Sequence, residues 1–558
     1  MRLHDQYLKL HSQHGGTDVI EVTLDELALT LGCTHRNVLH VVNKMVHQGW
    51  VIWVPNRGRG RRSRLTFLKQ PEDIAVESMI NAINRKDIGS AVAGIKAHAK
   101  SSTLQDTLQG WLLEYFGHHA EMNSNRQIDT LRLPVTQQLH TFDPLYMNLL
   151  AESFVSSHIF DGLVRRGSNR DEIVPNLAHA WETDESRTEW TFYLRKEVPF
   201  HHGKVLSSKD VVYSFQRLIQ SPQRTLYSCI FKEILQVTAL NPSTVKMVLK
   251  RPNELFLPFL CTSRAAIIPH ELSQWEESRF GRKPVGTGPF KVVEMNENLC
   301  VLDVFPYYFR GRAHLDRVEI LYVPWSTEAA SVDLSSPFHV IQNPLPSGEG
   351  AWSRIHSESY IRKFVTCNTQ KKGPLSDPFL RARLISCLNN PNSSNILHDP
   401  NIPSITLQVA TISQYKGDAE WVSSRLAEYG YTCKLVISSP EEFKGSVRME
   451  SDLIVFSLFR DQDEQLRLFD LYQTLSQHIE PHIRADIEGW LHNIAREEQP
   501  AVRAQAFQRI EDLLIEQNHL HILHEKPMQT AYLPSVRGVT FNSQGWVDLR
   551  HVWFPPIL

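Results

Sequence analysis

A chain of 558 residues is too long for one ordinary hydrophobic core, so about three or four lobes are expected. The hydrophobic content of 42% and the charged content of 22% are those of a soluble globular protein. The net charge is only −2, but residues 1–68 hold nine Lys/Arg and five Asp/Glu, while the remainder holds 50 and 56. A basic segment ahead of a mildly acidic body favours a polyanionic partner.

The cysteines and the N-terminal residues argue against two other classes. Seven cysteines are scattered without CxxC spacing, and an odd number fits poorly with a complete disulfide framework, so reduced thiols in a cytoplasmic protein are expected. The first 16 residues hold no apolar h-region and no small-residue cleavage site, so no secretory signal is expected. No run of about 18 apolar residues occurs, which predicts no membrane insertion.

The first 32 residues predict two helices and a short strand. Residues 3–12 have a helical apolar pattern, and residues 19–22 are a strand candidate. Thr23-Leu24-Asp25-Glu26 is a capping-box pattern, in which the Thr and Glu side chains satisfy free N–H groups where a helix begins. Gly32 is the expected end of that helix.

A third helix is predicted from His35 to about Gln48, with Thr34 as its N-cap. At helical spacing one face is apolar and carries Val38, Val41, Val42 and Met45. The other face is mostly polar and carries Arg36, Asn37, His40, Asn43, Lys44 and His47. A polar face alone is usually just solvated, so this pattern needs its context.

The stretch WVIWVPNRGRGRRSRLTFL at 50–68 predicts an arginine-tipped β-hairpin. An apolar strand at 51–54 enters a tip with two glycines and an asparagine, which accept the positive φ values of tight turns. Five arginines and no acid lie between positions 57 and 64. Guanidinium groups suit phosphate oxygens, although such a loop could also be solvated or bind a nucleotide or a protein.

Taken together, these elements follow the order of a winged helix-turn-helix at residues 1–70, with double-stranded DNA as the expected partner. Each part alone occurs often by chance, but the ordered set favours DNA binding. Bases would be contacted from the third helix and phosphates or the minor groove from the hairpin. The candidate DNA-binding residues are Thr34, His35, Arg36, Asn37, His40, Lys44, Arg57, Arg59, Arg61, Arg62 and Arg64.

Beyond the hairpin, residues 71–126 predict a helical connector, with His118-His119 closing a helix and 121–126 as the link onward. From residue 127 strand-like and helical runs alternate, which predicts an α/β body at 127–558. The chain lacks Walker A, dinucleotide-binding, HExxH, GxSxG and CxxC patterns. Histidine groups such as His201-His202 and HLHILH at 519–524 are better read as surface or hydrogen-bonded groups than as metal ligands. No catalysis, cofactor or metal is therefore predicted.

The body resembles the extracellular solute-binding proteins of the oligopeptide and nickel class. The resemblance is carried by segments that keep their order along the chain: IFDGLVRR at 159–166, PNLAHAWE at 175–182, WTFYLRKEVPFHHGKVLSSKDVVYSFQRL at 190–218, PVGTGPFKV at 284–292, FVTCNTQKKGPLSDPFLRARLISCLN at 364–389 and VRGVTFNSQGWVDLRHVWF at 536–554. It implies two α/β lobes hinged around a ligand cleft, the class II periplasmic-binding-protein-like fold. The segment Phe456–Asp461 lacks the acidic, tryptophan-rich loop that contacts ligands in the transported-solute binders, so a peptide ligand is not carried over.

Head and body together resemble the SgrR-type transcriptional regulators over nearly the whole chain, on LDELALTLGCTHRNV, QGWVIW and GRGRRSRLTFL. This resemblance implies a cytoplasmic regulator whose body senses a small molecule, with a sugar phosphate or related metabolite as a candidate. Loops that line the cleft in the family nominate Asp143, Leu145, Asn368 and Arg460 as ligand-binding residues. The alternative is a solute-binding component of an ABC transporter, and a homo-oligomer is left open.

Overall fold

The computed structural model describes residues 3–13, 19–56, 61–71, 73–74, 77–78, 116–123, 126–135, 138–147, 149–167, 169, 171–222, 225–274, 277–322, 340–342, 353–389, 405–439, 442–443, 445–532, 536–542 and 546–555. Its contacts divide the chain into two units. The first unit comprises residues 1–117 with 297–299 and 321–337, and the second comprises the remainder. Each unit is described by itself.

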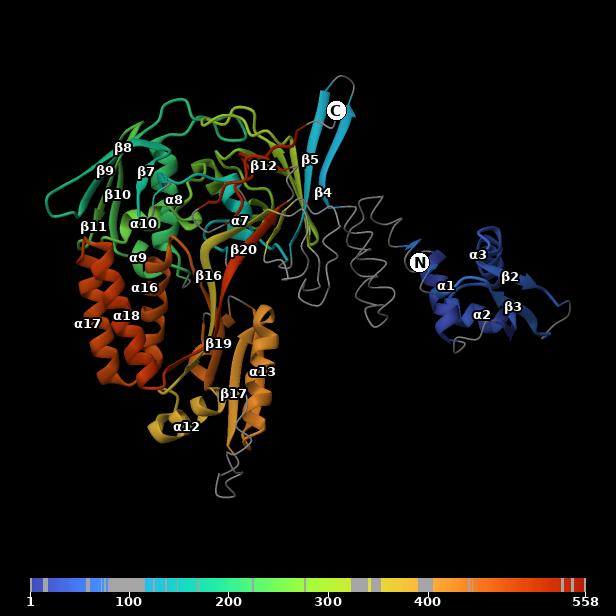
Figure 1. Ribbon diagram of the computed structural model, residues 1–558. Helices are drawn as coiled ribbons and strands as arrows, with labels where there is room; N and C mark the ends of the chain where they lie inside the picture. The colour runs from blue at the N-terminus through green and yellow to red at the C-terminus, as the bar shows by residue number, and fades with distance from the viewer. Residues whose placement is uncertain are drawn as a thin grey trace. The chain divides into compact units, whose positions relative to one another are not determined.

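The N-terminal part of the first unit has the elements that the sequence predicted (Figure 1). They are α1 (Leu3–Gln13), β1 (Val19–Val22), α2 (Leu24–Leu31), α3 (His35–His47), β2 (Val51–Val54) and β3 (Ser63–Phe67). The three strands form one antiparallel sheet in the order β1-β3-β2. We call this part the winged unit, because the β2–β3 hairpin follows the helix pair α2–α3, as in a winged helix-turn-helix.

Local chemistry accounts for the boundaries of these helices. The capping box is formed: the Glu26 amide donates to Thr23 Oγ1 at 3.2 Å, and the Thr23 amide donates to Glu26 Oε2 at 2.9 Å. Gly32 ends α2 in the left-handed region, with φ of 61°. The apolar face predicted for α3 is buried, and the ring edge of Tyr7 on α1 packs against Trp50 and Phe67. This small core fixes the angle between α3 and the hairpin.

The second unit, the body, is α/β, with strands distributed over several sheets. Its helices are α7 (Leu150–Ile159), α8 (Ser208–Gln220), α9 (Ser228–Phe231), α10 (Phe256–Leu260), α11 (Glu277–Arg282), α12 (Pro378–Asn389), α13 (Lys416–Ala427), α15 (Val447–Glu450), α16 (Glu464–Leu475), α17 (Pro481–Arg496) and α18 (Pro500–Glu516). Short 3₁₀ turns are η1 (Ser263–Ala265), η2 (His270–Gln274), η3 (Pro374–Ser376), η4 (Ser413–Tyr415) and η5 (Ser476–His478). None of the described helices is long and apolar enough to cross a membrane.

The strands of the body fall into two regions. The first holds β4 (Gly117–Asn123), β5 (Arg126–Val135), β6 (Val164–Arg166), β7 (Ile173–Pro175), β8 (Ala178–Thr183), β9 (Glu189–Leu194), β10 (Ile234–Asn241), β11 (Thr244–Leu249), β12 (Phe290–Met295), β13 (Leu299–Val304) and β14 (Arg317–Tyr322). The second holds β15 (Val340–Gln342), β16 (Ser353–Cys367), β17 (Thr406–Ile412), β18 (Thr432–Ser438), β19 (Leu453–Arg460) and β20 (Leu520–Tyr532). Sheet orders are β12-β13-β14-β5-β4, β10-β11-β9-β8 and β6-β7 in the first region, and β15-β20-β16-β19-β17-β18 in the second.

Two long strands, β16 and β20, enter and leave the second region. They pair antiparallel over most of their length, from Ser353↔Tyr532 to Thr366↔Leu520. They run side by side in Figure 1, and the chain continues after β20 to an isolated bridge between Arg537 and Trp553. The chain thus crosses between two lobes and returns, as the resemblance implied.

One expectation about the connector is wrong. Residues 117–123 form strand β4 at the edge of the five-stranded sheet, where a helical ending was expected. His118 therefore does not close a helix; its Nε2 lies 2.9 Å from Asp129 Oδ1, and its ring stacks on Phe554 at 4.0 Å. The strand is stabilised by pairing with β5, a tertiary contact that propensity along the chain does not report. Most of the remaining connector lies outside the described residues.

Candidate nucleic-acid interface and solute-binding body

The outward face of α3 is a polar stripe. At 100° per residue, Arg36, His40, Asn43 and His47 fall within an arc of about 60°, opposite the buried face. All four side chains are exposed. Within the described winged unit none of the four has a hydrogen-bond or ion-pair partner, so their donors are free to contact another molecule.

The positions around α3 show which polar residues lie on its outward face, and they differ in part from the candidate residues. Asn43 and His47 were not among the candidate site residues, yet they lie within the stripe, while Asn37 and Lys44 lie along one edge. The helical angle of each residue, read from the sequence, would have shown this. The opposite edge is apolar: Leu39 is 38% exposed and Val46 is 41% exposed.

The two candidates at the start of α3 have local roles. His35 Nε2 lies 2.7 Å from Asp25 Oδ1 on α2. Thr34 has the extended backbone of an N-cap and its carbonyl accepts the Asn37 and Val38 amides, but its side chain makes no cap hydrogen bond. Because that hydroxyl is exposed and uncommitted at the positive end of a helix dipole, Thr34 suits a phosphate contact.

The wing arginines are not equivalent. Arg62 donates to Glu26 Oε1 at 3.0 Å and to the Glu21 carbonyl at 3.2 Å, so it braces the hairpin against α2 and β1. Arg64 lies 3.7 Å from Glu21 Oε1. Among the described residues Arg61 has no such partner and is exposed. Arg57 and Arg59, which were predicted at the tip, lie outside the described residues.

Asp143 and Leu145, two ligand candidates of the body, belong to a buried ionic cluster. Arg217 on α8 grips Asp143 with two hydrogen bonds, both of 2.6 Å, and Asp143 Oδ1 also accepts the Leu145 amide at 3.0 Å. Arg264 donates to the Leu145 carbonyl at 2.5 Å, and burial lowers the pKa of Arg264 to about 10. Both oxygens of Asp143 are therefore occupied by the protein itself.

Asn368 follows the end of β16 and is fully buried. Its amide nitrogen donates to the carbonyls of Arg448, Met449 and Ser451 at 2.9–3.1 Å. Its Oδ1 accepts the amides of the two residues at 370 and 371, both at 3.1 Å. Both ends of the Asn368 side-chain amide are therefore used within the protein, where they hold the loops next to the end of β16.

Arg460 at the end of β19 is the most accessible of the four candidates, with 33% of its side chain exposed. It donates to Glu525 Oε1 at 3.0 Å and pairs with Glu464 at the start of α16. The structure does not bring the four candidates into one shared contact: Asp143 and Leu145 form one cluster, while Asn368 and Arg460 lie in two others.

Sequence reasoning missed a buried ionic cluster that joins β6 to the segment between β19 and α16. Arg166 on β6 donates to Asp463 Oδ1 at 3.0 Å, and Arg467 on α16 donates to Asp461 Oδ2 at 2.9 Å. All four side chains are buried or nearly so. The available signal was the pair of acids at 461 and 463 directly after a buried strand, because buried acids require cationic partners.

One group of side chains has the residue types of a metal site. The ligand atoms of Asp210, His270 and Glu271 lie within 4.8 Å of one another. However, Asp210 Oδ2 already accepts the Ser207 amide and hydroxyl at 2.7 and 2.9 Å, and Lys204 donates to Glu271 Oε1 at 2.7 Å. The lysine ammonium supplies the positive charge here, so we assign no metal to this group.

The geometry defines a class of protein: a winged helix-turn-helix unit joined to a two-lobed body of the solute-binding type. Comparison with known families agrees in both parts. Residues 2–119 match the family described as "Sugar transport-related sRNA regulator N-term", and residues 172–391 match "Bacterial extracellular solute-binding proteins, family 5 Middle".

Relatives match from end to end. The HTH-type transcriptional regulator SgrR of Pectobacterium atrosepticum is 27% identical over 596 residues, covering 100% of this chain and 99% of the relative. The uncharacterized protein YhjP of Bacillus subtilis is 26% identical over 570 residues, covering 96% of each chain. With both domains present in this order, the chain is similar over its whole length to SgrR-type regulators, which supports a DNA-binding regulator with a family 5 solute-binding domain.

Solved structures confirm the fold of the body. The DppA periplasmic binding protein of Helicobacter pylori, in complex with the peptide STSA, superposes with a TM-score of 0.62 and 20% identity, covering 76% of this chain and 98% of that one. A dipeptide binding protein from Pseudoalteromonas sp. SM9913, in complex with Met-Leu, gives a TM-score of 0.63 and 17% identity, covering 76% and 100%. At these identities the likeness concerns the fold.

Proposed function

We propose that α3 enters the major groove of double-stranded DNA in the cytoplasm, and that the body binds a small solute and thereby alters DNA affinity. The supporting observation is the uncommitted polar stripe of α3 beside a braced hairpin. Arg36 suits guanine and Asn37 and Asn43 suit adenine, while Arg57, Arg59 and Arg61 suit phosphates. Catalysis is not part of the proposal.

The experiment uses the full chain and a duplex selected from a random library. Arg36→Ala should raise the dissociation constant for that duplex about tenfold, because a bidentate arginine–base contact contributes about 1–3 kcal/mol. Lys9→Ala removes an exposed cation from α1 of the same unit and is the matched control, expected to bind like the parent protein. Equal affinities for Arg36→Ala and the parent would reject α3 as the reading element.

The solute proposed for the body is a sugar phosphate or related metabolite, in line with the family description of the N-terminal match. The second candidate function is transport, since the structural neighbours include an ABC transporter-associated binding protein. Fractionation of the native protein separates the two: recovery outside the cytoplasm would contradict the regulator. A regulator that senses its solute must also bind its operator differently at saturating solute.

A further inference from the structure

The body contains a groove that none of the four ligand candidates lines. It has a volume of about 370 Å³, within the range of small-molecule sites. One wall comes from α9 and the loop after β11, and the other from α16 and α17. The lining residues that matter here are Glu233 and Arg251 on the first wall and Phe469, Gln473, Glu488 and Arg496 on the second. We call it the α9–α17 groove.

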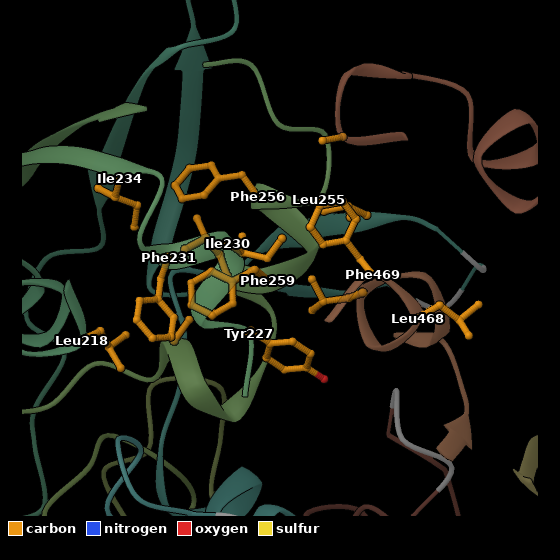
Figure 2. Packing of buried hydrophobic residues seen from close by; sticks show 14 of the residues in the cluster. Leu218, Tyr227, Ile230, Phe231, Ile234, Leu255, Phe256, Phe259, Leu468 and Phe469 are labelled. Carbon is orange, nitrogen blue, oxygen red and sulfur yellow. The ribbon is translucent and has the colours of Figure 1, made fainter. Parts of the chain in front are cut away.

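The two walls are held together by contacts that flank the groove. The Glu254 amide donates to the Ala495 carbonyl at 2.7 Å, and the Tyr227 amide donates to Asp470 Oδ1 at 3.0 Å. Beside these bonds, Phe469 of α16 lies close to Leu255 in an apolar cluster that includes residues of both walls (Figure 2). The two walls of the groove are therefore joined by hydrogen bonds and by one shared apolar core.

Part of the floor of the groove is apolar, and polar groups make up the larger share of the lining. Phe469, Leu491 and Ala495 are each at least nine-tenths buried, and the groove exposes part of their remaining surface. The small exposed part of Phe469 offers a contact for a flat or apolar part of a ligand. Water on such a surface is readily displaced by an apolar group.

The charges at the mouth leave one cation unmatched. Glu233 is paired with Arg251 at 2.8 Å, and Glu488 is paired with Arg484 at 2.7 Å, outside the lining. Arg496 contacts His492 Nε2 at 3.4 Å and has no carboxylate partner among the described residues. A guanidinium in this setting is suited to a bidentate contact with a carboxylate or a phosphate.

We infer that the α9–α17 groove binds a small organic anion, a carboxylate or a phosphate monoester, with its charge on Arg496 and its apolar face on Phe469. A ligand that contacts both walls binds only the folded arrangement of these walls, so it stabilises that arrangement. This inference does not depend on DNA binding: a protein that failed to bind any duplex could still bind the anion.

The test is ligand titration of the full chain with phenyl phosphate and with benzoate, using benzamide as the uncharged analogue. Both anions should raise the thermal midpoint and give saturable binding, and the difference between them identifies the preferred anion class. Arg496→Gln should weaken binding of the preferred anion about tenfold or more, since a charge-assisted pair is lost. Gln473→Trp should block binding by filling the groove.

The matched control is Arg509→Gln, which removes the same charge from an exposed position on α18 that does not line the groove. It should bind the anions like the parent chain. Thermal midpoints without ligand show whether each variant is folded. Absence of a shift with both anions, equal binding of benzamide, or unchanged binding by folded Arg496→Gln would each overturn the inference.

Discussion

Arg61 and Arg62 are neighbours in the sequence, but only Arg62 has hydrogen-bond partners among the described residues. Arg62 is held by Glu26 and the Glu21 carbonyl, whereas Arg61 is exposed and unpaired among the described residues. A guanidinium already paired with an acid contributes less net positive charge to a phosphate contact. A substitution of Arg61 should therefore affect mainly DNA affinity, and a substitution of Arg62 should affect mainly the stability of the fold.

Arg61→Gln should weaken binding to all duplexes and reduce the slope of log K against log salt by about 1, because one phosphate contact releases about one counterion. Its free energy of unfolding should stay unchanged. Arg62→Gln should lower that free energy by about 0.5–1 kcal/mol, as for a surface ion pair, with a smaller change in salt slope. Salt titrations and denaturant unfolding of both variants give the comparison, and equal salt slopes would refute it.

For single residues, the sequence identified the residue types but not the hydrogen-bond and ion-pair partners that they have in the fold. The capping box of Thr23 and Glu26 was predicted because its partners are three residues apart. Asp143 illustrates the opposite case: its partner Arg217 lies 74 residues away, and nothing in the local pattern announces the pair. The carboxylate of Asp143 was expected to face a ligand, and in the structure both of its oxygens accept hydrogen bonds from Arg217.

Helix α3, which we propose as the DNA-reading element, has two chemically different edges. Polar Asn37 and Lys44 flank the central stripe of α3 on one side, and Leu39 and Val46 flank it on the other. In the major groove the apolar feature of a base pair is the thymine C5-methyl group. An exposed leucine on a groove-facing helix is therefore suited to a thymine at the edge of the site.

Replacing each thymine of the selected duplex in turn by deoxyuridine removes only that methyl group. At one position we expect the parent chain to lose affinity by about threefold to tenfold, the value of burying one methyl. Leu39→Ala should bind both duplexes equally, because the side chain that contacts the methyl is absent. Leu29→Ala, at an exposed apolar position on α2, is the control. If deoxyuridine has no effect at any position, Leu39 does not read a methyl.

Elements were predicted well where their pattern is local and poorly where pairing partners are distant. The helices and strands of the winged unit follow from caps, glycines and apolar periodicity. Strand β4 was missed, because Gly117–Asn123 has no clear alternation and depends on β5 for its pairing. The two-lobed architecture came from resemblance, since periodicity alone cannot place β16 beside β20.

At the scale of the whole molecule, the body contains histidines that accept a hydrogen bond at one ring nitrogen and donate one at the other. Only the neutral imidazole can do both. His158 Nε2 accepts the Leu549 amide at 3.1 Å, leaving Nδ1 to donate to the Phe154 carbonyl at 2.9 Å. This bond connects α7 to a segment 391 residues further along the chain. Burial lowers the pKa of His158, so acid acts on a contact that joins the segment around Leu549 to α7.

His201 has the same arrangement. Its Nδ1 accepts the Gly286 amide at 3.2 Å, and its Nε2 donates to the Gly288 carbonyl at 3.0 Å. Burial lowers the pKa of His201 from 6.5 to about 4. A proton on Nδ1 would oppose the Gly286 N–H, so the folded state resists protonation while the unfolded chain accepts it.

The folded protein should therefore lose stability as the pH falls from about 6.5 towards 4, because the unfolded state binds more protons throughout that window. Between pH 7 and pH 5 the contribution of His201 is about 2 kcal/mol. His201→Gln, which keeps one donor and one acceptor, should be less stable at pH 7 yet lose about 2 kcal/mol less on acidification. Denaturant unfolding at both pH values measures this, with exposed His314→Gln as the control expected to follow the parent chain. An identical loss in His201→Gln and the parent would show that this ring is not held neutral, and the acid sensitivity of the body would have to come from other groups.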